Sequence, residues 1–265
     1  MHITEDLHLH TYLSKCAKNG GHARDYVAQA QSEGLSVIAF TDHMWDSAVP
    51  GASDWYKPQD MAHIGQLRAE LAELPAGPVR VLFGCETECD KNGVVGITQE
   101  AASRLDILLV PNSHTHMLDF VMPREYNGIP DKHGAFMVRH FMDIIRSPVA
   151  RYITAIPHPF AAVGKSASEK EEILASISDA AFAECFAAAR EMDIALELNT
   201  SVFACIPEQQ LRTGEFARMY MIAREAGCRF TFGTDAHAVA HMVTLPAALP
   251  LLDAAGITQD MILVP

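Results

Sequence analysis

The chain contains seven apolar runs of strand length, and a short polar cluster follows each of them. Stretches with the spacing of amphipathic helices separate the runs, so strands and helices alternate. This alternation predicts a parallel sheet, because two parallel strands need a long crossover, usually a helix, between them. The runs cover residues 3–9, 35–40, 79–83, 107–111, 152–156, 194–198 and 230–232.

Seven such repeats predict an α/β fold with a closed or nearly closed barrel rather than an open sheet. Helices are expected around residues 61–74, 136–145 and 181–192, where apolar side chains or alanines recur at helical spacing. Three glycines also stand where glycine commonly ends a helix before the next strand. These are Gly34, Gly227 and Gly256.

The length and composition fit one domain spanning residues 1–265. Hydrophobic residues make up 49% of the chain, which is enough for a substantial core. The formal net charge of −13 disfavours nucleic acid or an anionic membrane surface as the main partner. A small phosphorylated metabolite is compatible with this charge, because bound cations would reverse the local sign.

The cysteines and the hydropathy pattern bear on the cellular compartment. The six cysteines show no paired CxxC motif, which favours a reducing, cytoplasmic setting. The first ten residues are polar and acidic and lack the apolar core of a signal peptide. No run of about 18 apolar residues occurs, so no membrane-spanning helix is expected. The sequence gives no indication of the oligomeric state.

Six of the polar clusters supply side chains that commonly bind metals. His8 and His10 are two apart on a predicted strand, so they point to the same side. An isolated pair of this kind would fit a histidine-rich turn equally well. A parallel barrel, however, brings all the clusters to one face, where imidazoles and carboxylates can hold several divalent cations. The candidate ligands are His8, His10, His43, Glu86, His114, His158, Asp235 and His237.

The order of these motifs resembles that of the PHP (polymerase and histidinol phosphatase) family. The similarity covers essentially the whole chain and comprises DLHLHT, TDH, a glutamate in GCE, a strand-end histidine, PHP and TDAH. It implies a distorted seven-stranded (β/α)7 TIM-like barrel. It also implies a metal-dependent phosphoesterase that uses two or three divalent ions, with Zn, Fe and Mn as the candidates.

The resemblance distributes the ligands over three metals, the first two of which share Glu86 as a bridge. The first metal would be held by His8, His10, Glu86 and Asp235, the second by Glu86, His114 and His158, and the third by His43 and His237.

Cys16 stands where the family has the remaining histidine ligand of the third metal. A thiolate is a good zinc ligand, so Cys16 can complete the site and would favour zinc over manganese. In the other interpretation Cys16 is a small buried residue and the centre holds two metals. Both interpretations stay open at this point.

Several further polar residues also have two interpretations. His116 either lines the substrate pocket or faces solvent. Asp42 is expected to orient a neighbouring ligand, whereas Asn199 either contacts substrate or caps the following segment. His22 is interpreted as a surface residue at a helix start. The histidines without a strand-end position are expected to be structural or exposed, namely His2, His63, His133, His140 and His241.

The predicted reaction is hydrolysis of small phosphate monoesters by a metal-activated water. Clustered cations offset the charge of the phosphate and lower the pKa of a coordinated water toward about 7, so no covalent nucleophile is needed. Glu86, Asp235, His237 and His116 are the catalytic candidates. His116, His237 or a water could protonate the leaving alkoxide. L-histidinol phosphate is one candidate substrate.

Two other functions are compatible with parts of the pattern. Amidohydrolases, which act on amides or lactones, also use HxH, two later histidines and a late aspartate, but many need a bridging lysine where this chain has Glu86. A non-catalytic scaffold stabilised by metals is the second alternative. The retention of nearly all ligands, without a polymerase module, counts against it.

Overall fold

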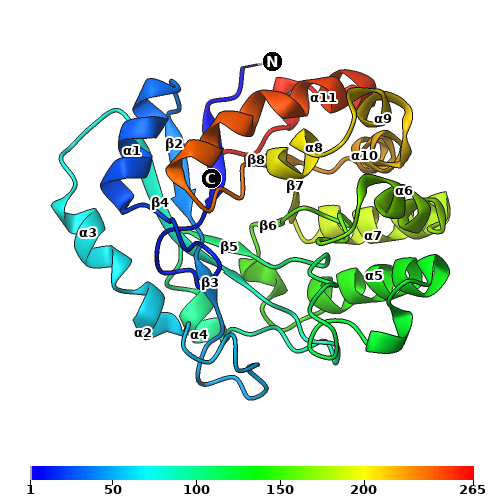
Figure 1. Cartoon of the computed structure of the whole chain (residues 1–265), viewed down its shortest axis with the longest axis horizontal. Helices are drawn as coiled ribbons and strands as arrows, with labels where there is room; N and C mark the ends of the chain where they lie inside the picture. Colours follow the sequence, from blue (N-terminus) through cyan, green and yellow to red (C-terminus); the bar gives the residue numbers. More distant parts are fainter. Residues whose placement is uncertain (1) are drawn as a thin grey trace.

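The computed structural model describes residues 2–265, except for the side chains of residues 244 and 245 (Figure 1). Its parallel sheet has the strand order β1-β2-β4-β5-β6-β7-β8, and a short strand, β3, pairs with β4. The strands are β1 (Glu5–Leu9), β2 (Val37–Phe40), β3 (His43–Met44), β4 (Arg80–Thr87), β5 (Ile107–Leu109), β6 (Ala155–Ile156), β7 (Ala195–Asn199) and β8 (Phe230–Gly233).

The sheet curves into a nearly closed barrel. Beyond the end of β8, Ala236 forms a parallel bridge with Leu9 of β1, and its carbonyl accepts a hydrogen bond from the His10 amide at 3.0 Å. Seven strands in this order confirm the predicted α/β barrel.

Helices cover the outside of the barrel, with α1 to α3 on one side of the strands and α5 to α7 on the other (Figure 1). No described helix is both long and apolar enough to cross a lipid bilayer. The α-helices are α1 (Ala23–Ser32), α2 (Met61–Ile64), α3 (Leu67–Glu73), α4 (Gln99–Ala102), α5 (Pro130–Ile145), α6 (Ala167–Ala175), α7 (Asp179–Glu191), α8 (Thr200–Ala204), α9 (Glu208–Thr213), α10 (Glu215–Glu225) and α11 (Leu249–Ala255). The 3₁₀ helices are η1 (Arg124–Tyr126), η2 (Ala150–Tyr152), η3 (Val239–Ala248) and η4 (Gln259–Met261).

The expected elements agree with the structure except at their bounds. The helix expected at residues 61–74 is divided into α2 and α3, because Gly65, a weak helix former, ends the first one. The strand expected at 152–156 keeps only two residues, since η2 occupies its beginning. All three predicted stop glycines have the positive φ that glycine tolerates best.

Two apolar clusters fill the fold. The larger one lies between the sheet and the helices. The smaller one is built from strand residues alone, as expected for the interior of a small barrel. Its buried members are Leu7, Val37, Ala39, Leu82, Ile107, Leu109, Ala155 and Ala195.

Gly84 of β4 lies directly against the neighbouring strand. A Cβ added there would stand 2.1 Å from the Ile107 carbonyl oxygen and 2.4 Å from Ile107 Cγ2. With any larger residue at position 84, one of the two strands would have to shift away from the other. Gly84 therefore lets β5 approach β4 just below Glu86.

We predict that Gly84→Ala lowers the free energy of unfolding by about 1–3 kcal/mol, the usual cost of overpacking, as measured by urea denaturation. Gly77→Ala is the matched control, because its added Cβ would meet the flexible Gln31 side chain at 3.2 Å and the Pro75 carbonyl oxygen at an ordinary contact distance of 3.9 Å. The control should change stability by less than about 0.5 kcal/mol. Equal stability of the two variants would contradict the close packing described at Gly84.

Candidate metal centre

The predicted ligands gather at the carboxyl ends of the strands. Contacts between side chains connect all nine of them, including Cys16, into one cluster. Their positions are His8 in β1, His10 and Cys16 after it, His43 in β3, Glu86 in β4, His114 after β5, His158 after β6, and Asp235 and His237 after β8.

Three donor atoms, from His8, His10 and Asp235, form one compact group, and one oxygen of Glu86 contacts both histidines. The Nε2 atoms of His8 and His10 are 3.0 Å apart. Glu86 Oε2 lies 3.4 and 3.5 Å from them, and Asp235 Oδ1 lies 3.6 and 3.1 Å from them. Donor atoms bound about 2.1 Å from one tetrahedral cation stand about 3.4 Å apart. Each carboxylate therefore lies at a distance from His8 and His10 that suits a shared cation of the size of zinc.

The other oxygen of Glu86 faces a second pair of histidines. Oε1 lies 3.1 Å from His158 Nε2 and 3.8 Å from His114 Nε2. The centroids of these two rings are 4.9 Å apart. The carboxylate thus presents one oxygen to each group of imidazoles, which is the arrangement that a ligand shared by two metals needs.

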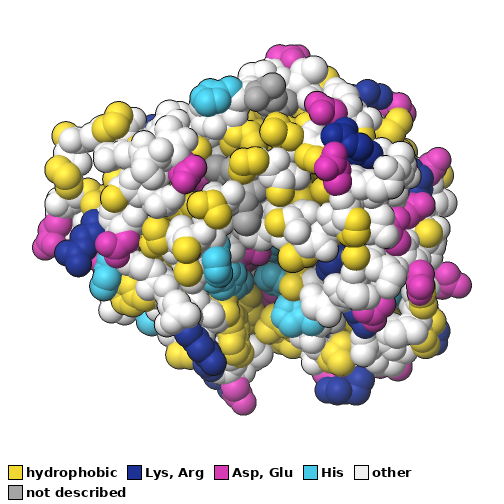
Figure 2. Space-filling model, turned by 45° about the horizontal axis from the view of Figure 1, so that its top comes forward, with side chains coloured by type: hydrophobic (Ala, Val, Ile, Leu, Met, Phe, Trp, Pro, Cys, Tyr) yellow, Lys and Arg dark blue, Asp and Glu magenta, His cyan; other side chains and the backbone are white. Residues whose placement is uncertain are grey.

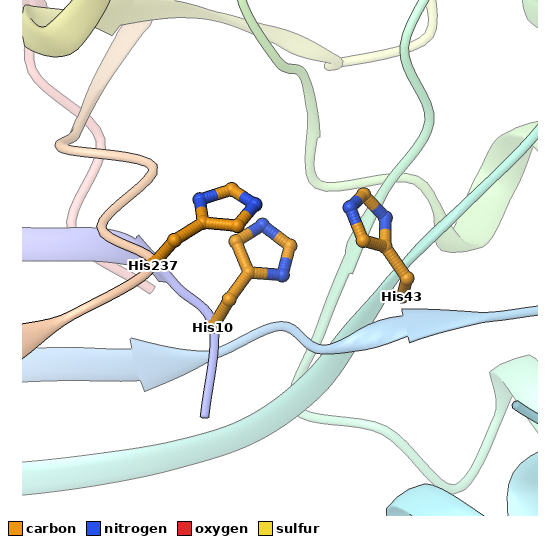
Figure 3. A group of neighbouring side chains, drawn as sticks. All are labelled: His10, His43 and His237. Carbon is orange, nitrogen blue, oxygen red and sulfur yellow. The ribbon is translucent and has the colours of Figure 1, made fainter. Parts of the chain in front are cut away.

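A third group adjoins the first one. His10, His43 and His237 each offer a ligand atom, and these atoms lie within 4.8 Å of one another (Figure 3). The His43 Nδ1 atom is 3.1 Å from Glu86 Oε2. Cys16 Sγ lies 3.1 Å from His237 Nε2, so Cys16 contacts one of its two predicted partners, while His10 is the third member of the group.

Two buried glutamates fix the rings of His8 and His114. The Nδ1 atom of His8 donates to Glu197 Oε1 at 2.8 Å. The Nδ1 atom of His114 donates to Glu88 Oε2, also at 2.8 Å. Such a bond sets the tautomer, so the lone pair that can bind a metal lies on Nε2. Both Nε2 atoms face Glu86.

Two serines form hydrogen bonds with the Nδ1 atoms of His10 and His158. His10 Nδ1 lies 3.0 Å from Ser14 Oγ, and the Ser14 hydroxyl donates to Asp42 Oδ1 at 2.6 Å. Because Ser14 donates its hydroxyl hydrogen to Asp42, its oxygen accepts the hydrogen bond from His10 Nδ1. Ser113 Oγ is hydrogen-bonded to His158 Nδ1. The orienting role expected for Asp42 agrees with this chain of bonds.

Apart from Asp42, these orienting residues were not among those predicted from the sequence. Glu88 lies two residues beyond Glu86, so the two-residue period of a strand already placed both on the same side. Glu197 belongs to one of the seven polar clusters. Ser14 and Ser113 carry no comparable signal, because only the folded loops bring them to the histidines.

The cluster perturbs the titration of its carboxylates. Burial raises the pKa of Glu86, but His8, His114 and His43 outweigh it and hold this pKa well below its usual range. Burial also raises the pKa of Asp235, but His8 and His10 outweigh this effect, so that the pKa of Asp235 is lowered. Burial lowers the pKa of His114, yet Glu88 and Glu86 raise it to about 9. Both candidate ligand carboxylates are therefore ionised at neutral pH, as metal binding requires.

Two buried atoms of the cluster support a fit to a cation. Within the described part of the chain, Glu86 Oε2 and His43 Nδ1 are buried and make no hydrogen bond, because the 3.1 Å contact between them lacks hydrogen-bond geometry. A buried polar atom without a partner costs about 1–3 kcal/mol, or more when it is charged. A divalent cation would satisfy both atoms, and donors of mixed nitrogen and oxygen type suit Zn, Fe and Mn.

The backbone is unusual at two of the candidate ligands. His158 has a φ of 31° and Asp235 a φ of 55°, values that residues other than glycine rarely adopt. The loop after His158 is held from below by Lys170, whose buried Nζ donates to the carbonyls of Ala161 at 2.7 Å and Ala162 at 3.0 Å. Such backbone conformations persist where surrounding contacts hold them, commonly at functional sites.

A cavity of about 570 Å³ opens onto the cluster. His116 lines this cavity and is also exposed to solvent, so both interpretations of that residue hold in part. Burial, together with His114 and His158, lowers the pKa of His116 to about 4. The lining residues are Cys16, His43, Ser53, Trp55, Tyr56, His114, His116, Met117, Leu118, Phe120, Val163, Asp235 and His237.

The polar residues outside the cluster have structural positions. His22 is exposed at the start of α1, as expected. Asn199 caps α8 by accepting a hydrogen bond from the Val202 amide at 2.9 Å. His133 is buried in α5, and its Nε2 is 2.8 Å from Thr115 Oγ1 in the loop between His114 and His116.

A family model described as PHP domain matches residues 6–201, which is about three quarters of the chain. The chain belongs to this family. Asp235 and His237 lie beyond the matched residues. Among curated relatives, a probable phosphatase of Thermoanaerobacter sp. (strain X514) is 26% identical, covering 99% of this chain and 91% of its own length. A probable phosphatase of Vibrio parahaemolyticus is 22% identical, with coverages of 99% and 90%.

Two solved structures share the fold. Histidinol phosphate phosphatase from Lactococcus lactis, complexed with zinc, L-histidinol and phosphate, superposes with a TM-score of 0.63 at 20% identity and covers 96% of this chain and 94% of its own. A putative histidinol phosphatase from Listeria monocytogenes has a TM-score of 0.60 at 13% identity, with coverages of 90% and 97%. Identities this low establish the common fold alone.

Proposed function

We propose that this protein is a metal-dependent phosphatase that hydrolyses small phosphate monoesters. The observation that carries the proposal is the division of the two Glu86 oxygens between two groups of imidazoles. The membership in the PHP domain family and the relatives named probable phosphatase point to the same chemistry.

The proposed ligand sets follow the contacts described above. His8, His10, Glu86 and Asp235 would hold one cation, and Glu86, His114 and His158 a second. Bound divalent cations supply two things here, namely compensation for the charge of the phosphoryl oxygens and activation of water. Zinc, iron and manganese are the proposed ions, since all three accept imidazole nitrogen with carboxylate oxygen.

The chain's own residues position the reactants. Hydrolysis joins a water oxygen to phosphorus, breaks the bond from phosphorus to the ester oxygen, and transfers a proton to the departing alcohol. His116 is neutral at pH 7, because its pKa is lowered to about 4, so it suits hydrogen bonding to substrate better than acid catalysis. His237 also lines the cavity and is proposed to pass the proton while the third cation site is empty, whereas a water on that cation would do so once His237 binds it.

L-histidinol phosphate is one substrate to test, since a protein of this fold was crystallised with L-histidinol and phosphate. The amidohydrolase alternative gains no support from the site. Among the described residues that line the cavity none is a lysine, and the buried Lys170 is engaged by backbone carbonyls.

We predict that Glu86→Gln lowers both bound metal and phosphate release, the latter by more than about tenfold in kcat/KM, a barrier change above about 1.4 kcal/mol. The amide keeps the size of the side chain but removes the charge that two cations would share. Phosphate release from phosphorylated metabolites, with Zn²⁺, Mn²⁺ and Fe²⁺ tested separately, and elemental analysis measure the two effects.

Glu191→Gln, on the exposed face of α7, serves as the matched control and should change neither quantity. His158→Ala should remove mainly one metal equivalent, because this residue contacts only one oxygen of Glu86. A Glu86→Gln protein with normal metal content and turnover would refute the bridging role.

Cys16 is proposed as a ligand of a third cation together with His43 and His237. Cys16 is exposed as a residue, but the partial removal of its thiol from water, with Glu86 and Asp235, raises the pKa of the thiol to about 12. A cation would therefore have to displace the thiol proton, which makes this site sensitive to pH. The contact of 3.1 Å between Cys16 Sγ and His237 Nε2 supports the proposal, because two ligands of one metal must lie close together.

We predict that Cys16→Ala binds about one metal equivalent fewer than the wild-type chain while keeping the first two. Elemental analysis after gel filtration measures this loss. Cys205→Ala is the control, since Cys205 is also a free, exposed cysteine. Identical metal content in the wild-type, Cys16→Ala and Cys205→Ala proteins would show that Cys16 is not a metal ligand.

A further inference from the structure

The part of the cavity that lies away from the metal ligands has its own chemistry. Figure 2 shows histidine side chains gathered at the hollow in the molecular surface, with hydrophobic side chains next to them. A cavity of about 570 Å³ has room for more than a phosphate group. Whatever alcohol carries the phosphate must therefore lie against the walls beside the histidines.

Three loops build these walls, and their side chains are largely apolar. Trp55 and Tyr56 come from the segment between β3 and α2, and Val163 comes from the loop after β6. The segment after β5 contributes Met117, Leu118 and Phe120.

Aromatic contacts join the wall to the metal centre. The centroid of the Trp55 ring lies 5.2 Å from that of His43, with the rings nearly perpendicular. Trp55 contacts Tyr56 at 4.7 Å, and Tyr56 contacts Phe120 at 5.8 Å between centroids. The Tyr56 hydroxyl donates to Glu88 Oε2 at 3.3 Å. The wall therefore stands at a fixed place relative to the candidate ligands.

The same wall offers no charged group for a substrate. Among the described residues lining the cavity there is no lysine or arginine, and the one carboxylate, Asp235, belongs to the metal centre. Lys165 lies two residues beyond Val163, but its Nζ is 3.2 Å from Glu169 Oε1 and it lines a separate, smaller cavity. A second charge on the substrate would lose water here without gaining a partner, which is costly.

We infer that the substrate is a phosphate monoester of an uncharged alcohol that carries an apolar, preferably planar, ring. This inference rests on the proposed phosphatase function and narrows its substrate class. An apolar ring gains free energy by leaving water, and it can stack or meet edge to face with Trp55 and Phe120. This wall provides no comparable binding free energy for polyhydroxylated sugars, bisphosphates or substrates with a free ammonium group.

The first test compares phosphate release from 2-phenylethyl phosphate, ethyl phosphate, glycerol 3-phosphate and L-histidinol phosphate by the zinc-loaded full chain. All four are esters of primary alcohols, so the leaving groups are chemically similar and the wall contacts differ. We expect kcat/KM for 2-phenylethyl phosphate to exceed each of the others by about tenfold or more. A higher value for glycerol 3-phosphate or L-histidinol phosphate would overturn the inference but leave the phosphatase function intact.

The second test is independent of turnover. Calorimetry should show that 3-phenylpropylphosphonate, a non-hydrolysable analogue, binds the zinc-loaded chain at least about tenfold more tightly than propylphosphonate. Trp55→Ala should reduce this preference, whereas Tyr152→Ala, an aromatic change before β6 at the opposite end of the barrel, should preserve it. Equal binding of the two phosphonates by the wild-type chain would refute the apolar wall. If binding shows the preference and no ester is hydrolysed, the phosphatase proposal fails instead.

Discussion

The contacts of the buried Glu86 carboxylate with the surrounding histidines organise the candidate metal centre. Glu86 is 1% exposed, and an isolated ionised carboxylate in such surroundings would be very costly. Five histidines contact it, each through a ring nitrogen within 3.8 Å of one of its oxygens. The pKa of His114 is raised to about 9, so imidazolium charge offsets part of the carboxylate charge, and bound cations would take over this role at the proposed metal centre.

The strands of the barrel hold the histidines and carboxylates in the positions that these contacts require. The register of β3 with β4 sets His43 directly opposite Glu86. Gly233 of β8 lacks a side chain where Glu197 meets His8, and an added Cβ there would lie 2.0 Å from Glu197 Oε1. Glu197 can therefore reach the His8 ring only because this position is glycine. Outer carboxylates orient the inner histidines, and the parallel strands hold both layers in place.

Much of this could be predicted from the sequence, because the signals are local. Each strand ends in its own polar cluster, and the closure of a parallel barrel brings those ends together without further information. Glu88 and Glu197 also carry local signals, namely the two-residue strand period from Glu86 and a position in a polar cluster, although neither was predicted to orient a histidine. The two residues of β3 are too few to form a recognisable run, and the division into α2 and α3 depends on a single weak helix former, Gly65.

Other features could not be predicted, because they arise only from contacts between distant segments. The pairing of Ser113 with His158 joins residues 45 positions apart. The wall formed by Trp55, Tyr56 and Phe120 likewise brings two loops together. Nothing in either loop alone indicates that its apolar side chains line a cavity instead of the core.

The most direct test of the bridging carboxylate is anomalous diffraction from crystals of the zinc-loaded protein at the zinc absorption edge. A Glu86 shared by two metals predicts two strong peaks, one close to each carboxylate oxygen. The first should lie among His8, His10 and Asp235, and the second beside His114 and His158. A single peak at Glu86, or zinc bound only to surface histidines such as His22, would contradict the shared role of this residue.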